Sequence, residues 1–177
     1  CPRWATRSRR REIVRGSRLD HPAVQRVIAA LRAKGSGAEV IELETTARTA
    51  EDAARGLGVP VGAIVKSLVF TIDGAPVMAL IAGDRRCEVK ALPAAFGRAG
   101  LVIRADADRV REVTGFVIGG VAPLGHPRAL ATAIDDSLGR FETVYAAAGH
   151  PHCVFPTTVL ELSLLTGGAV VKGISSA

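Results

Sequence analysis

The sequence Ala63-Ile64-Val65-Lys66-Ser67-Leu68-Val69-Phe70 decides the fold, together with the turn and the apolar run that follow it. Apart from Lys66 and Ser67, every side chain in this stretch is apolar. The dipeptide Asp73-Gly74 comes next, and a second apolar run covers residues 75–82. Because Asp-Gly between two such runs favours a two-residue hairpin turn, the stretch predicts one buried strand of a β-hairpin.

Lys66 is the unusual residue of this strand. The chain has four lysines against nineteen arginines, and an ammonium group in an apolar strand is costly unless it is paired or faces a cleft. Two interpretations are open from this segment alone. Either Lys66 faces a functional cleft, or strand alternation places it on a solvent face, where its stem reaches the surface.

A glycine-rich loop follows a second apolar segment further along the chain. Residues 116–118 are apolar and predict a strand, and the chain continues as Gly119-Gly120-Val121-Ala122-Pro123-Leu124-Gly125-His126. Glycine lets a backbone approach a ligand closely and expose its N–H groups. Taken alone, Gly119-Gly120 equally indicates a simple turn or bulge.

Three motifs occur together in one order: the lysine strand, the pattern Gly119-x-x-x-Pro123, and Ala133-Ile134-Asp135. With these motifs the chain resembles the YbaK family of aminoacyl-tRNA deacylases, which are free-standing relatives of the editing insertion domain of bacterial prolyl-tRNA synthetase. The resemblance covers about residues 20–174. It implies hydrolysis of the ester that joins a wrong amino acid to the terminal adenosine of a tRNA, without a metal or other cofactor.

The resemblance implies catalytic roles for Lys66, Gly119, Gly120 and Asp135. Lys66 would contact a phosphate or ribose hydroxyl and orient the ester, since a protonated lysine is a poor base. Backbone N–H groups of the glycine loop would grip the ester carbonyl oxygen, where one donor contributes about 3–4 kcal/mol in favourable cases. Asp135 would pair with Lys66 or orient water, although its neighbour Asp136 fits a helix N-cap. A ribose hydroxyl of the substrate can assist.

A second group of residues is expected to bind the substrate. Ser67 would hydrogen-bond the ribose or the water, or else it is a strand hydroxyl satisfied by the backbone. The others lie in the glycine loop and in a later glycine-containing segment, namely Val121, Ala122, Pro123, Gly125, His126, Gly149 and His152.

Ala122 departs from the family pattern. The YbaK enzyme that acts on cysteinyl-tRNA(Pro) carries serine directly before the loop proline. The alanine here favours other prolyl-editing branches, whose substrates carry alanine, serine or a short unnatural side chain. Size exclusion discriminates by only about 1–3 kcal/mol per methylene, so the sequence does not identify the amino acid that is removed.

Three late histidines, His126, His150 and His152, are candidate general bases, because histidine as a residue type can exchange a proton near neutral pH, or they are surface residues. A two-histidine metal site is a further interpretation, but neither a carboxylate nor a third ligand lies at a diagnostic spacing. Cys153 near these histidines is a candidate nucleophile, yet its neighbours Val154 and Phe155 favour a small buried core residue.

Charge and composition bound the class of protein. The net charge of +6 lies in residues 1–18, which hold seven arginines and one glutamate, whereas residues 19–177 hold 16 basic and 16 acidic side chains. We expect residues 1–18 to be a basic, disordered tail, or an arm that holds RNA phosphates, and residues 19–177 to be one editing domain.

The compartment and the partners follow from similar reasoning. Three separated cysteines without a Cys-x-x-Cys pair fit a reducing cytoplasm. Neither 18 consecutive apolar residues nor a secretory leader is present in the sequence, so we expect no membrane contact. The expected partner is the acceptor end of an aminoacyl-tRNA, with prolyl-tRNA synthetase as a further candidate and the oligomeric state left open.

The remaining elements are predicted from caps and periodicity. Asp20 as N-cap and Pro22 indicate a helix over residues 21–34, and Thr158-x-x-Glu161 is a capping box. Further helices are expected at residues 49–57, 88–96 and 106–113, and further strands at 40–43, 101–103, 130–134, 143–147 and 170–171. This order predicts an α+β domain with a curved, mixed, mainly antiparallel sheet, a barrel-like core and flanking helices.

Two functions other than editing remain open at this point. A non-catalytic tRNA- or RNA-binding module would keep the fold and lose the chemistry. A small-molecule esterase would usually show a nucleophile elbow or a metal set, and Gly-x-Ser-x-Gly is absent from the sequence.

Overall fold

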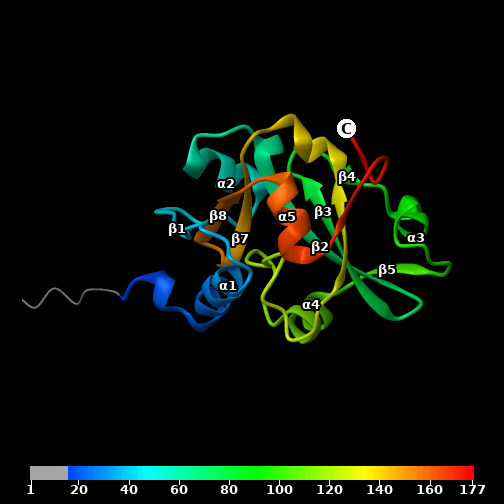
Figure 1. Cartoon of the computed structure of the whole chain (residues 1–177), viewed down its shortest axis with the longest axis horizontal. Coiled ribbons are helices and arrows are strands. Elements are labelled where there is room, and N and C mark those ends of the chain that lie inside the picture. The colour runs from blue at the N-terminus through cyan, green and yellow to red at the C-terminus, as the bar shows by residue number, and fades with distance from the viewer. Residues whose placement is uncertain (1–15) are drawn as a thin grey trace, which may run out of the picture.

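The hairpin expected from residues 63–82 lies at the centre of the sheet in the computed structural model, which describes residues 16–177 (Figure 1). Strands β2 (Ile64–Ile72) and β3 (Ala75–Ala82) pair antiparallel from Val65 with Ala82 to Ile72 with Ala75. The two residues between the strands, Asp73 and Gly74, have φ angles of 48° and 81°. This left-handed geometry is what an Asp-Gly turn supplies, so the predicted hairpin is confirmed.

Seven of the eight strands of the main sheet follow the order β1-β8-β7-β2-β3-β6-β9, and β5 lies beside β2. The pairs β7–β2, β3–β6 and β6–β9 are parallel, and the other four pairs are antiparallel. The remaining strands of this sheet are β1 (Ile41–Glu42), β5 (Val102–Arg104), β6 (Ala131–Asp135), β7 (Val144–His150), β8 (Cys153–Thr157) and β9 (Ala169–Val171). The predicted mixed, mainly antiparallel sheet is confirmed.

Side chains alternate between two buried layers on the two faces of the hairpin. Val65, Val69 and Leu80 belong to the larger hydrophobic cluster, and Phe70 and Ile81 belong to a second cluster on the opposite face. Because successive strand residues point to opposite faces, a strand covered on both sides has to be apolar along its length. This explains the unbroken apolar run of β3.

Helices supply the cover on both faces. Helices α1 (Pro22–Ala33), α4 (Ala107–Thr114) and α5 (Val159–Thr166) contribute to the larger cluster, and α3 (Leu92–Ala95) contributes to the smaller one. Helix α2 (Ala50–Leu57) covers a third, small cluster beside Ile64. The short elements are the 3-10 helices η1 (Arg18–Asp20), η2 (Val61–Ala63), η3 (Val89–Ala91) and η4 (Asp136–Arg140), and the paired strands β4 (Arg86–Cys87) and β10 (Ser175–Ser176).

The caps predicted from threonine are present, but the cap predicted for α1 is wrong. The side chains of Thr49 and Thr158 accept hydrogen bonds from the amides of Asp52 and Glu161, as N-cap threonines do. In α1 the N-cap is His21, whose Nδ1 accepts from the amide of Ala23, because Asp20 is already part of η1.

The prediction of a strand over residues 116–118 is also wrong. Helix α4 ends at Gly115, which has φ 75°, and the chain then turns so that the amide of Gly120 donates to the carbonyl of Val117 at 3.0 Å. Phe116 is buried as an anchor of this loop, whereas Ile118 is 62% exposed. An apolar run can anchor a loop to the core without pairing as a strand, and sequence alone does not distinguish the two cases.

The chain contacts the sheet from Ser17 onwards. Ser17 and Arg18 both hold the carboxylate of Glu42, at 2.8 Å from the serine hydroxyl and 2.9 Å from the guanidinium. These contacts attach two residues of the predicted tail to β1. The rest of that tail, residues 1–15, lies outside the described residues.

A glycine in β7 allows helix α1 to approach the sheet closely, and this contact is testable. Gly149 has φ 90°, and a Cβ placed on it would lie 2.7 Å from the carbonyl oxygen of Ala23. We predict that Gly149→Ala lowers the free energy of unfolding by about 2–4 kcal/mol, because it combines left-handed strain with a backbone clash. Urea unfolding would measure the change.

Gly139→Ala is the matched control for this variant. A Cβ on Gly139 meets no atom of the described chain within 4 Å, and its backbone is not left-handed. We expect this substitution to change stability by less than about 1 kcal/mol. Equal stabilities of the two variants would contradict the packing described for α1.

Candidate active site

A cavity of about 360 Å³ lies beside β2, between the part of β2 that pairs with β7 and the part that pairs with β5. It is bounded by β2, by the start of α2, by the glycine loop and by β7. The lining residues from these elements include Arg48, Thr49, Glu51, Lys66, Ser67, Val69, Ile118, Gly119, Val121, Tyr145 and Ala147, and Arg104, Ala105, Val110 and Val154 complete the walls. The cavity therefore joins the lysine strand to the glycine loop.

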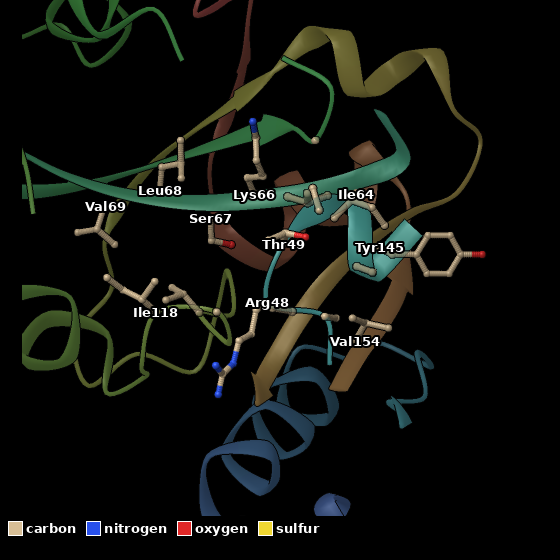
Figure 2. Close-up of a pocket in the computed structure, with 18 of the residues that line it drawn as sticks. Arg48, Thr49, Ile64, Lys66, Ser67, Leu68, Val69, Ile118, Tyr145 and Val154 are labelled. Carbon is tan, nitrogen blue, oxygen red and sulfur yellow. The ribbon is translucent and has the colours of Figure 1, made fainter. Parts of the chain in front are cut away.

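Lys66 and Ser67 leave β2 in opposite directions (Figure 2). Ser67 lies on the face of the glycine loop, and Lys66 lies on the face of the β3–β4 turn. Both residues nevertheless border the cavity, because the strand edge between them is open on one side. The alternation of strand side chains thus separates two groups that are adjacent in sequence.

The ammonium group of Lys66 is held at the cavity edge by a turn. Its Nζ donates to the carbonyl oxygen of Arg85, and the next residue back, Asp84, forms an ion pair with Arg140 at 2.7 Å. Burial lowers the pKa of Lys66, and the charges of Glu51 and Asp84 partly offset this effect. The lysine therefore has a fixed position beside the cavity, rather than the free solvent position considered from sequence.

The two adjacent glycines of the loop do different things. Gly119 lines the cavity, has φ 96°, and its nearest neighbour would be Arg48 Cγ at 3.6 Å from an added Cβ. Gly120 packs against β7, where an added Cβ would lie 2.9 Å from the backbone nitrogen of His150. The amide of Gly120 is already bonded to Val117, whereas Gly119 and Val121 are the loop residues beside it that line the cavity.

The structure places Asp135 outside the cavity lining. This aspartate is fully buried, and its carboxylate accepts hydrogen bonds from the amide of Ala82 at 3.3 Å and from the hydroxyl of Ser137 at 2.6 Å. It also accepts from the amide of Ser137 as the N-cap of η4. The cap predicted for Asp136 is thus made by Asp135, and this geometry supports a structural role for it instead of the catalytic one.

Several of the other residues expected to bind substrate pack inside the loop or against α1 instead of facing the cavity. Gly125 approaches the backbone of Arg26, and His126 Nε2 lies 2.8 Å from the carbonyl oxygen of Ala122. The ring of His126 packs against the edge of Phe116. Burial lowers the pKa of His126, although its hydrogen bond to Ala122 opposes the shift. Ala122 and Pro123 are buried beside these contacts and do not line the cavity.

Neither His152 nor Gly149 lines the cavity, and Gly149 packs against Ala23 of α1. His152 Nδ1 lies 3.1 Å from the carbonyl oxygen of Leu43. His150 stacks between His21 and His152, with ring centroids 5.2 and 5.7 Å away. These three rings form a histidine cluster behind the glycine loop, and the cavity lining contains none of them.

Neither Cys87 nor Cys153 lines this cavity. Cys153 is completely buried, and burial raises the pKa of its thiol to about 11, which supports the core interpretation over the nucleophile. Within residues 16–177, histidine, cysteine and carboxylate side chains do not gather in any group of three that could hold a metal ion. Nor is any helix in that range long and apolar enough to cross a membrane.

Sequence analysis missed several cavity residues. Arg48 and Arg104 are exposed at the cavity, and Tyr145 lines it from β7. Figure 2 shows Arg48 on the Ser67 side of the cavity. Nothing in the sequence separates these two arginines from the other seventeen. Arg48 comes from the loop before α2 and Arg104 from β5, and only folding brings these two segments to one cavity.

Comparisons with known proteins agree with this geometry. The family model of the aminoacyl-tRNA editing domain matches residues 44–164. The uncharacterized protein YwhH of Bacillus subtilis is 36% identical over 126 residues, which cover 71% of this chain and 79% of YwhH. A proline--tRNA ligase of Oleidesulfovibrio alaskensis is 37% identical over 89 residues, half of this chain and 15% of the ligase.

A solved structure gives the same result at the level of the fold. A candidate trans-editing enzyme for prolyl tRNA synthetase superposes with a TM-score of 0.80 at 39% identity, covering 85% of this chain and 96% of that one. The chain belongs to the family of aminoacyl-tRNA editing domains. It is an aminoacyl-tRNA deacylase, a hydrolase of the ester bond.

The histidine cluster predicts acid sensitivity. Burial first, and then the charges of His21 and His152, lower the pKa of His150. The unfolded chain therefore takes up this proton more readily, so the stabilising contribution is present above the usual histidine pKa of about 6.5 and is lost as the pH falls through the lower, folded value. Protonation of Nδ1 would also break the hydrogen bond from the amide of His152.

We predict that the free energy of unfolding falls between about pH 7 and pH 5, and that His150→Gln makes this fall smaller. Urea unfolding at a series of pH values would measure both chains. Identical slopes for the variant and the parent chain would show that the cluster does not carry the pH dependence.

Proposed function

We propose that this chain is a trans-editing deacylase that removes a small non-cognate amino acid, such as alanine, serine or cysteine, from tRNA(Pro). The observation that carries the proposal is the shared cavity of Lys66, Ser67 and Gly119. The likeness to proline--tRNA ligases supports tRNA(Pro) as the substrate. The small apolar walls formed by Val69, Val121 and Ala147 favour a short side chain.

The chemistry follows from the groups that face the cavity. The N–H groups of Gly119 and Val121 would donate hydrogen bonds to the ester carbonyl oxygen and stabilise the charge that develops there when water attacks. The histidines lie elsewhere, so we assign no side chain of the cavity as general base and assign that assistance to a ribose hydroxyl of the substrate. The bond that breaks joins the carbonyl carbon to the ribose oxygen, which leaves as a hydroxyl.

Positive charge at the cavity suits a polyanionic substrate. Lys66, Arg48 and Arg104 lie on its walls, against the single carboxylate of Glu51 in the lining. Lysine and arginine contact phosphate oxygens and fix the register of a nucleic acid without reading its sequence. In this proposal Lys66 positions the terminal nucleotide, and Arg48 and Arg104 attract the acceptor end.

Deacylation of tRNA(Pro) charged in turn with Ala, Ser, Cys and Pro tests the proposal. We predict turnover of at least one non-cognate ester and sparing of prolyl-tRNA(Pro). Lys66→Ala should lower kcat/KM by about 10–100-fold, the effect of losing a hydrogen bond from a charged group.

Lys172→Ala is the matched control, since Lys172 is exposed beyond β9 and away from the cavity. It should leave kcat/KM unchanged. Binding of tRNA without turnover of any ester would favour the alternative, a non-catalytic RNA-binding module, and would contradict the proposal.

A further inference from the structure

The edge of β2 that faces the cavity has a gap in its hydrogen-bond ladder. On one side β2 pairs with β3 continuously from Val65 to Ile72. On the other side β7 pairs with β2 at Ile64 and Val65, and β5 pairs from Phe70 onwards. In the described part of the chain, residues 66–68 therefore lack a neighbouring strand along this edge, and Val69 is held there by a hydrogen bond from the amide of Ala105.

The direction of the neighbouring hydrogen bonds shows which residue points into the gap. The carbonyl oxygen of Val69 accepts from Ala105, and the amide of Asp73 donates to Leu101, both at 3.0 Å on the β5 side. The carbonyl oxygen of Ile64 accepts from Gly83 on the β3 side. Because the backbone polar groups of successive strand residues alternate in direction, Ser67 directs its N–H and its C=O into the gap.

The side chain of Ser67 is unusual in the same place. Its hydroxyl is buried and makes no hydrogen bond with any described residue. Buried polar groups are nearly always paired, so an unpaired one in a cavity wall calls for a partner. Ser67 thus offers three hydrogen-bonding groups at the cavity wall, namely its backbone N–H, its backbone C=O and its hydroxyl.

We propose that Ser67 recognises the main-chain atoms of the aminoacyl group, with its carbonyl oxygen accepting a hydrogen bond from the α-ammonium group. The inference rests on the function proposed above and adds the part of the substrate that Ser67 reads. An aminoacyl ester carries a nitrogen donor and a carbonyl acceptor on one carbon, as a strand residue does. It therefore fits the place of the missing residue in the ladder, in the manner of strand addition.

This arrangement separates two kinds of recognition. The contact with Ser67 reads groups that every amino acid has, so it fixes the ester in the cavity without selecting a side chain. Selection by size is left to the apolar walls. Glu51 is the acidic residue of the lining and is the rival acceptor for an ammonium group.

Replacing the ammonium group tests the proposal directly. Alanyl-tRNA(Pro) and lactyl-tRNA(Pro) carry the same methyl group and the same type of ester, but the second has a hydroxyl in place of the ammonium group. After subtraction of the uncatalysed rates, we expect kcat/KM to be about 10–100-fold higher for the alanyl ester, the range for a charge-assisted hydrogen bond. N-acetyl-alanyl-tRNA(Pro) should be hydrolysed as slowly as the lactyl ester, or more slowly.

Two variants identify the acceptor. Ser67→Ala removes the hydroxyl but keeps the backbone carbonyl, so the preference for the alanyl ester should persist. Glu51→Gln should also retain the preference, and its loss in this variant would assign the ammonium group to Glu51 and overturn the inference.

The outcomes also separate this inference from the function on which it rests. Equal hydrolysis of the alanyl and lactyl esters would overturn recognition by Ser67 and leave the deacylase standing. Failure to hydrolyse any ester on tRNA(Pro) would overturn both.

Discussion

The interruption of the β2 ladder between β7 and β5 is the constraint on which the site depends. Strand β2 is held firmly by β3 along its length, so its other edge can be left unpaired over residues 66–68 without loss of the strand. An unpaired strand edge is usually a liability, because it offers N–H and C=O groups to any passing chain. Here the edge is enclosed by the glycine loop and the start of α2, and it becomes the wall of a cavity.

The same edge explains how Lys66 and Ser67 act from opposite faces of one strand. In a sheet paired on both sides, these two side chains would be separated by the sheet itself. Because the strand is open at this point, the cavity reaches both. The turn that carries Arg85 fixes the ammonium group of Lys66, and the Asp84–Arg140 ion pair ties that turn to η4.

Behind the cavity, the glycine loop is held by contacts of residues that do not line it. Gly120 packs against the backbone of His150, and Gly149 packs against the backbone of α1. The ring of His126 packs against Phe116. These close approaches position the N–H groups of Gly119 and Val121. The residues around the loop that resemble a catalytic set, the histidines above all, thus serve as the support of the loop.

The sequence predicted the hairpin, the threonine caps and the joining of Lys66 to Gly119, because each depends on local pattern or on a motif. The sequence did not distinguish Gly119, which lines the cavity, from Gly120, which packs against the backbone of His150. That packing depends on the tertiary structure. The sequence also misjudged residues 116–118, whose apolar pattern serves equally for a strand and for a buried anchor. Asp135 was assigned to the site by its motif. Its carboxylate instead accepts a hydrogen bond from the amide of Ala82, and residue spacing cannot predict this tertiary contact.

The central claim is that the aminoacyl ester lies between the open edge of β2 and the glycine loop. A crystal structure with a non-hydrolysable analogue, alanine joined by an amide to 3′-amino-3′-deoxyadenosine, tests this most directly. We predict that the alanyl group lies in the cavity, with its carbonyl oxygen within hydrogen-bond distance of the Gly119 or Val121 amide and its nitrogen near the Ser67 carbonyl. An analogue bound with its alanyl group outside this cavity, for example among His21, His150 and His152, would contradict it.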